Sequence, residues 1–176
     1  MSIVICVVEN DKTFYLASDK RAIKNGIIND NYKKIYELKT HIYFAMTGIA
    51  EVGLSFLEII KKNIDQPIKE FLKKVDSKFP TGRTRLTVTI AGLDENNKYF
   101  IWQKNNSGMI TNAKIGPNII SYSISSNDNM ELFDNYFQDC VNSVHSVQYC
   151  IADTIKYASE IDNSISSGYD LIMFEK

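Results

Sequence analysis

The chain of 176 residues has little of what several classes of protein need. It has three cysteines, Cys6, Cys140 and Cys150, an odd number with neither redox nor metal-ligand spacing. This excludes a disulfide framework and predicts inert thiols among apolar neighbours. The two histidines, His41 and His145, have no partners at metal-ligand spacing, and the glycines form no phosphate-binding loop. We therefore expect no metal and no other cofactor.

The charge and hydropathy of the chain exclude two kinds of partner. A formal net charge of −1 leaves no basic field for nucleic acid. No apolar run approaches the ~20 residues of a membrane helix. The apolar stretch near the N-terminus is too short for a secretory signal and lacks the basic flank that such a signal has. We expect no nucleic-acid or membrane partner and a reducing, cytoplasmic location.

The length and composition suit one globular domain spanning residues 1–176, with 44% hydrophobic residues to form a core. Apolar runs and alternation predict strands, which lie at 2–8, 14–19, 34–38, 41–46, 86–90, 99–102, 109–111, 119–123 and 169–174. Helical spacing predicts two helices between Ala50 and Phe79, with Pro67 starting the second. Two more helices follow, capped by Asn127 or Asp128 and by Ser143.

The order of these elements defines the expected fold class. Strands, a helix pair, further strands, a second helix pair and a last strand favour an α+β fold. The expected architecture is a four-layer αββα sandwich, in which two antiparallel sheets lie between outer helix pairs.

Three residues in the first part of the chain have the chemistry of an N-terminal nucleophile site. Removal of Met1 would leave Ser2 with a hydroxyl and a free α-amine, while Asp19 ends the second strand and Lys34 follows. In such a site the hydroxyl attacks a carbonyl and the α-amine takes its proton. The lysine's charge keeps that amine neutral enough to act as a base. While Met1 remains attached, this chemistry is blocked.

Four motifs carry a family resemblance by their order and spacing. They are Ser2-Ile3-Val4, Ser18-Asp19-Lys20-Arg21-Ala22, Lys34-Ile35 and Thr47-Gly48-Ile49-Ala50. Together they resemble the proteasome-type Ntn hydrolases, which include proteasome β subunits, the bacterial HslV peptidase and the Anbu proteins. The spacing agrees if the first hairpin has about one extra residue. The resemblance extends to about Phe174 and implies the same αββα sandwich.

The resemblance implies a role for each matched residue. Ser2 would be the nucleophile, in place of the family's usual threonine, and Asp19 would hold Lys34 in position. The charge of Lys34 would lower the pKa of the terminal amine and stabilise developing negative charge. The neighbouring Lys33 lies on the opposite face of the strand, so only one of the two lysines can face the site. Gly48 would supply an oxyanion donor, since its lack of a Cβ lets the backbone N–H approach a substrate.

The resemblance also implies a substrate pocket. Ala22, Met46, Ala50 and Leu54 match the positions that line the pocket for the residue before the scissile bond. Methionine at its base favours an apolar side chain of moderate size.

Two later motifs depart from the family pattern. Ser123-Ile124-Ser125 stands where the family has Gly-Ser-Gly. Three alternatives follow: Ile124 occupies the position of the family's serine, a one-residue shift brings Ser123 or Ser125 to that position, or the supporting serine is missing. Near the end, Asp162 and Ser166 match the family's Asp-x-x-Ser-Gly-Gly with one residue inserted. The resemblance places both behind the amine, where they would help to move its proton, although a plain serine-rich loop explains them almost as well.

The sequence thus favours an amide hydrolase of the peptidase or amidase type, with Ser2 as nucleophile. The alternatives are a catalytically inactive structural or ring-scaffold subunit and an amidase for small molecules. Serine in place of threonine favours the inactive subunit, and the retained Asp19, Lys34 and Gly48 oppose it. The resemblance implies self-assembly into a ring or open spiral and a peptide or amide substrate. It also allows an unfoldase partner, which no residue identifies.

Overall fold

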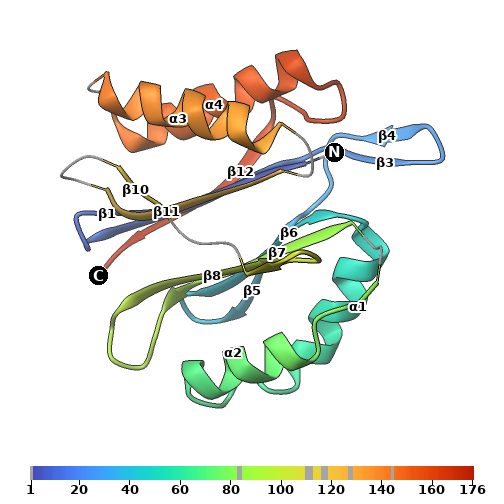
Figure 1. Ribbon diagram of the computed structural model, residues 1–176, viewed down its shortest axis with the longest axis vertical. Helices are drawn as coiled ribbons and strands as arrows, with labels where there is room; N and C mark the ends of the chain where they lie inside the picture. The colour runs from blue at the N-terminus through green and yellow to red at the C-terminus, as the bar shows by residue number, and fades with distance from the viewer. Residues whose placement is uncertain (1, 83–84, 110–112, 116–118, 127–128, 144) are drawn as a thin grey trace.

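The computed structural model describes residues 2–82, 85–109, 113–115, 119–126, 129–143 and 145–176. Its elements form four layers: two sheets stacked face to face, with a helix pair over each outer face (Figure 1). The fold class expected from the order of elements is confirmed.

The two main sheets are antiparallel. The first has the strand order β10-β11-β1-β2-β12 and the second the order β5-β6-β7-β8-β9. The strands of the first sheet are β1 (Ile3–Glu9), β2 (Thr13–Asp19), β10 (Ala113–Ile115), β11 (Ile119–Ser126) and β12 (Tyr169–Glu175). Those of the second are β5 (Ile35–Lys39), β6 (Ile42–Gly48), β7 (Leu86–Leu93), β8 (Tyr99–Asn105) and β9 (Gly108–Met109). Two residues of the predicted strand 109–111, Ile110 and Thr111, lie outside the described residues.

The central position of β1 explains its unbroken apolar sequence. Its odd-numbered side chains, such as Ile3 and Ile5, pack under α3 (Met130–Asn142) and α4 (Val147–Ile161). Its even-numbered side chains, such as Val4 and Cys6, pack against the second sheet. A strand covered on both faces needs apolar residues at successive positions.

Four amphipathic helices cover the sheets. The first pair, α1 (Ala50–Lys61) and α2 (Ile68–Ser77), buries side chains at helical spacing under the second sheet. The predicted cap of the fourth helix was wrong: Ser143 ends α3, and Ser146 caps α4 by accepting a bond from the Tyr149 N–H at 3.2 Å. The Ser143 N–H donates to the carbonyl oxygens of Asp139 and Cys140, so this serine belongs to the last turn of α3. The predicted caps of α3, Asn127 and Asp128, lie outside the described residues.

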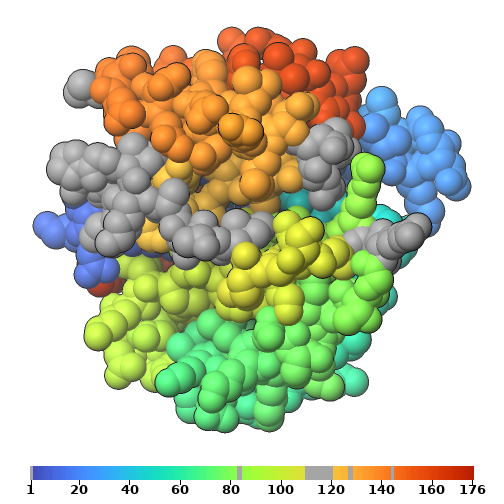
Figure 2. Space-filling model, in the orientation of Figure 1, coloured from blue at the N-terminus to red at the C-terminus, as the bar shows by residue number. Residues whose placement is uncertain are grey.

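A short hairpin that the sequence analysis did not predict projects from one end of the sandwich. It consists of β3 (Ala22–Lys24) and β4 (Ile27–Asn29), which form a separate two-stranded sheet. Asn25 and Gly26 connect them with φ values of 50° and 80°, the left-handed geometry of a tight hairpin turn. The hairpin stands out from the rest of the surface (Figures 1 and 2).

The N-terminal end of β1 lies beside this hairpin, and the C-terminus lies at the opposite end of the sandwich (Figure 1). Because β1 runs antiparallel to β2, the start of β1 meets the end of β2 at Asp19. Two predicted site residues, Ser2 and Asp19, are therefore gathered at one end of the first sheet. Among the described residues, no helix is long and apolar enough to cross a membrane.

The thiols are free. Cys6 and Cys150 are buried, and burial raises the pKa of both thiols, while Cys140 is half-buried. The two buried thiols, Cys6 and Cys150, therefore stay protonated and unreactive.

Candidate active site

A cavity of about 760 Å³ opens at the end of the sandwich where the chain begins. The hairpin β3–β4, the first turns of α1 and the residue before β1 form its walls. Ser2, Lys34 and Gly48 all line it. The residues predicted for the substrate pocket line the same cavity: Ala22, Met46, Ala50 and Leu54. The structure thus brings seven predicted site residues to one hollow.

The carboxylate of Asp19 lies at the centre of the hydrogen bonds around this cavity. Its Oδ1 accepts bonds from the Ile3 N–H at 2.9 Å and from Lys34 Nζ at 2.7 Å. Its Oδ2 accepts bonds from the backbone N–H groups of Arg21 at 3.0 Å and Ser166 at 3.3 Å. The side chain is fully buried, so these four donors replace the water that its charge would otherwise need. Asp19 therefore joins the N-terminal strand, the lysine and the C-terminal loop.

Lys34 is a buried cation whose ammonium faces this carboxylate. The residue is 3% exposed, and burial lowers the pKa of its ammonium while the charge of Asp19 opposes that shift. The neighbouring Lys33 is exposed, with its Nζ 5.3 Å from the centre of the Tyr36 ring. Lys34 is accordingly the member of the pair that faces the cavity.

Ser2 immediately precedes β1 and is 6% exposed. The bond from the Ile3 N–H to Asp19 fixes the backbone directly after it. Ser2 thus shares the cavity with Lys34, and the carboxylate of Asp19 binds both Lys34 and the backbone N–H of the residue after Ser2. This arrangement places a hydroxyl residue and a buried positive charge on the wall of one cavity.

Gly48 ends β6 in a conformation that requires glycine. Its φ is +107°, and a Cβ built there would lie 2.0 Å from the carbonyl oxygen of Arg85. That oxygen accepts a bond from the Ile49 N–H at 2.8 Å, so the strand cannot easily move away. The missing side chain lets the backbone of residue 48 lie this close to Arg85, and Gly48 also lines the cavity.

The register of β11 shows which faces of the sheet hold Ser123, Ile124 and Ser125, the alternatives for the position of the family's serine. Ile124 packs with Ile3 in the core beneath α3 and α4, on the face directed away from the second sheet. Side chains alternate along a strand, so Ser123 and Ser125 lie on the other face. Ser125 is paired with Val4, two residues after Ser2. Ser125 is therefore the nearer of the two serines, along the register, to the start of β1.

The loop between α4 and β12 supports the site from behind. The Ser166 hydroxyl accepts a bond from the Lys20 N–H at 3.1 Å and donates to the Gly168 carbonyl oxygen at 2.8 Å. Asp162 Oδ1 accepts bonds from the backbone N–H and the hydroxyl of Ser164. Its Oδ2 is buried without a partner among the described residues. Neither Asp162 nor Ser166 lines the cavity, and Ser166 reaches the site through Asp19.

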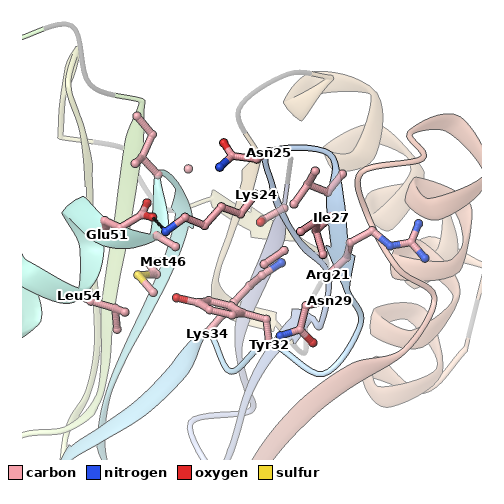
Figure 3. Close-up of a pocket in the computed structure, with 16 residues that line it drawn as sticks. Arg21, Lys24, Asn25, Ile27, Asn29, Tyr32, Lys34, Met46, Glu51 and Leu54 are labelled. Atoms are coloured by element: carbon pink, nitrogen blue, oxygen red, sulfur yellow. Dashed lines mark ion pairs between the residues drawn. The ribbon is translucent and has the colours of Figure 1, made fainter.

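Arg21, whose side chain the sequence analysis did not consider, ties the hairpin to this loop. Its guanidinium donates to Asp30 Oδ2 at 2.9 Å and to the carbonyl oxygen of Asn163 at 2.7 Å. Figure 3 shows the guanidinium directed away from the cavity. A distant contact of this kind leaves no signal in the local sequence.

Three further residues that line the cavity were missed by the sequence analysis: Lys24, Tyr32 and Glu51. Lys24 of β3 forms an ion pair with Glu51 of α1, with 2.7 Å between Nζ and Oε1. Tyr32 lies beside them and directs its hydroxyl toward Met46 and Leu54 (Figure 3). The Asn25-Gly26 turn signal could have placed Lys24 on a hairpin, but not opposite Glu51. In the part of the chain that the structure describes, no group of three or more His, Cys, Asp or Glu side chains could hold a metal.

The two stacked antiparallel sheets with a helix pair over each outer face define the class of the protein. It has the proteasome-like αββα fold of the Ntn hydrolases. The model of the proteasome subunit family matches residues 3–172, so the chain belongs to that family. The resemblance read from the four motifs is confirmed.

Comparison with solved structures agrees with this assignment. The fold is similar to that in the crystal structure of eukaryotic HslV from Trypanosoma brucei, with a TM-score of 0.76 and 99% of each chain covered. The sequences are 11% identical, so this likeness concerns the fold alone. No curated protein matches the sequence.

Proposed function

We propose that the protein is an N-terminal-nucleophile amide hydrolase, a peptidase or amidase, with Ser2 as nucleophile after removal of Met1. The observation that carries the proposal is the buried Lys34–Asp19 pair beside the start of β1. A buried charged pair costs several kcal/mol per ion in desolvation, so stability alone is a weak reason to place one at a cavity. An ammonium beside the terminal amine is what this chemistry needs.

The reaction uses residues already gathered at the cavity. The Ser2 hydroxyl attacks the substrate carbonyl, and the terminal amine takes the hydroxyl proton. The Gly48 N–H stabilises the oxyanion, and Lys34 stabilises developing negative charge. The amine returns the proton to the departing amine as the C–N bond breaks, which leaves an ester on Ser2. Water then hydrolyses that ester and frees the hydroxyl. Asp19 holds Lys34, Ser166 and Asp162 support the loop behind the amine, and no cofactor takes part.

Intact mass spectrometry with a peptide epoxyketone tests the proposal, because this probe requires a hydroxyl and an amine on one residue. We expect the native protein to lack the mass of Met1 and to gain one probe adduct. Ser2→Ala should abolish the adduct, and Ser2→Thr, the family's usual nucleophile, should retain it. Retention of Met1 without an adduct, or an adduct that persists in Ser2→Ala, would refute the proposal.

The pH dependence of kcat/KM is a second expected outcome. The reactive form has a neutral amine and a charged Lys34. Activity should rise with pH through the amine pKa, which the nearby ammonium holds below its ordinary ~7.7–8.0. It should fall as Lys34 loses its proton, and burial places the pKa of Lys34 below its ordinary 10.5. The expected profile is a bell, and an alkaline limb at or above 10.5 would contradict it.

Two alternatives have observations in their favour. A non-catalytic structural subunit fits the serine in place of threonine and the orientation of Ile124 away from the second sheet. An amidase for small molecules fits the cavity volume of about 760 Å³, which lies within the range of small-ligand sites. Activity on short amides but not on peptides would select the second. We further propose that copies of this protein assemble into a ring or spiral in the cytoplasm. An unfoldase is a further proposed partner, and co-purification would reveal it.

A further inference from the structure

The mouth of the cavity is bridged by opposite charges from two separate walls. Lys24 belongs to β3 of the projecting hairpin, and Glu51 belongs to the first turn of α1. Their charged groups meet at 2.7 Å. Figure 3 shows Lys24 reaching from the hairpin to Glu51, with Met46 and Leu54 on the same side of the cavity as Glu51. The charged pair and the apolar side chains of Met46 and Leu54 therefore line one cavity.

The charged side chains that line the cavity are all paired. Among its described lining residues these are Arg21, Lys24, Lys34 and Glu51. Arg21 is bound by Asp30 and Lys34 by Asp19, and the other two bind one another. A charged group that entered would therefore lose its hydration without gaining a free counter-charge.

The floor of the cavity is apolar and of limited depth. Met46 is packed onto Gly53 of α1, where a Cβ would lie 2.2 Å from the methionine sulfur. Met46 is 3% exposed and cannot move deeper into the core. With Leu54 and Ala50 beside it, this floor suits an unbranched or branched aliphatic side chain.

Removal of either partner would change the charge at the mouth without unfolding the protein. The side chains of Lys24 and Glu51 are 75% and 64% exposed, and exposed pairs contribute little to stability. The hydrogen bond between them raises the pKa of Lys24 and lowers that of Glu51, so both carry charge at neutral pH.

We propose that the Lys24–Glu51 bridge determines the specificity of the cavity for uncharged aliphatic side chains on the acyl side of the scissile amide. The inference builds on the proposed hydrolase function. When the bridge is intact, neither charge is available to a substrate. When one partner is neutralised, the other attracts a side chain of opposite charge.

Reciprocal charge removal tests this bridge. The substrates are three otherwise identical peptides with norleucine, glutamate or lysine before the cut, and the readout is the ratio of their kcat/KM values. Wild type should prefer norleucine. Glu51→Gln should raise the glutamate-to-norleucine ratio about 5-fold, and Lys24→Gln should raise the lysine-to-norleucine ratio similarly, as a partly screened charge near a surface allows.

Two controls accompany these variants. The double variant Lys24→Gln/Glu51→Gln has no free charge, so both ratios should return toward the wild-type values. Glu58→Gln breaks the ion pair with Lys61 on the same helix, which lies outside the cavity lining, and should leave all ratios unchanged. Equal ratios in wild type and both single variants would overturn the proposal.

Binding measurements separate this inference from the proposed function. Acetylated peptide amides that end in norleucine, glutamate or lysine are titrated into each variant, in the Ser2→Ala background, by calorimetry. A switch of preference with charge removal supports the bridge even if no protein hydrolyses any substrate. Hydrolysis without any switch refutes the bridge and leaves the hydrolase intact, and absence of binding to all three peptides also refutes the bridge.

Discussion

Replacement of Asp19 by Asn should destabilise the protein by about 3–5 kcal/mol, the range for removing one partner of a buried ion pair. The change preserves shape but removes the charge that faces Lys34 Nζ at 2.7 Å. It also presents an NH₂ group where an oxygen now accepts. Each of the two carboxylate oxygens accepts bonds from two N–H groups. In either orientation of the asparagine amide, its NH₂ group would therefore face two other donors. Urea unfolding measures the loss.

Asp76→Ala is the matched control for Asp19→Asn. Asp76 forms an ion pair with Lys104 at 2.6 Å, but its side chain is 49% exposed. An exposed pair is screened by water, so its loss should leave stability almost unchanged. The Asp19 variant should also lose the epoxyketone adduct, because Lys34 and the start of β1 lose their common anchor. If both variants unfold at the same urea concentration, the buried pair has no structural role.

Replacement of Gly48 by Ala should lower stability by roughly 2–4 kcal/mol and reduce kcat by about 100-fold or more. The methyl group would lie 2.0 Å from the Arg85 carbonyl oxygen, so the strand must move. That movement displaces the N–H proposed to stabilise the oxyanion. Thermal unfolding and steady-state kinetics measure the two effects.

Gly82→Ala separates backbone strain from collision. Gly82 has a φ of +109°, nearly that of Gly48, but no atom of the described part of the chain lies within 4 Å of a Cβ built there. Strain alone should cost about 1 kcal/mol, without loss of activity. If Gly48→Ala costs no more than Gly82→Ala and keeps its activity, the proposed close approach at Gly48 is wrong.

Local pattern was sufficient for much of the fold. The unbroken apolar run of β1 and the helical spacing in α1 depend on neighbours within a few residues. Ser143 shows where such reasoning fails, because a serine near a helix boundary suits either end and the turn between α3 and α4 places Ser146 at the cap. The β3–β4 hairpin shows another limit, since strands of three residues on either side of Asn25-Gly26 are too short to show an alternating pattern.

The sequence by itself determined the family and the candidate chemistry. Ser2, Asp19, Lys34 and Gly48 stand at fixed spacings near the ends of strands, and antiparallel pairing brings strand ends together. Only the tertiary structure decided that Ile124 of β11 faces away from the second sheet and its neighbours Ser123 and Ser125 lie on the other face, because a shift of one residue exchanges the two faces of a strand. The same holds for the links of Lys24 to Glu51 and of Arg21 to Asn163. Such contacts join residues far apart in the chain, and their partners are set by how whole layers pack rather than by local pattern.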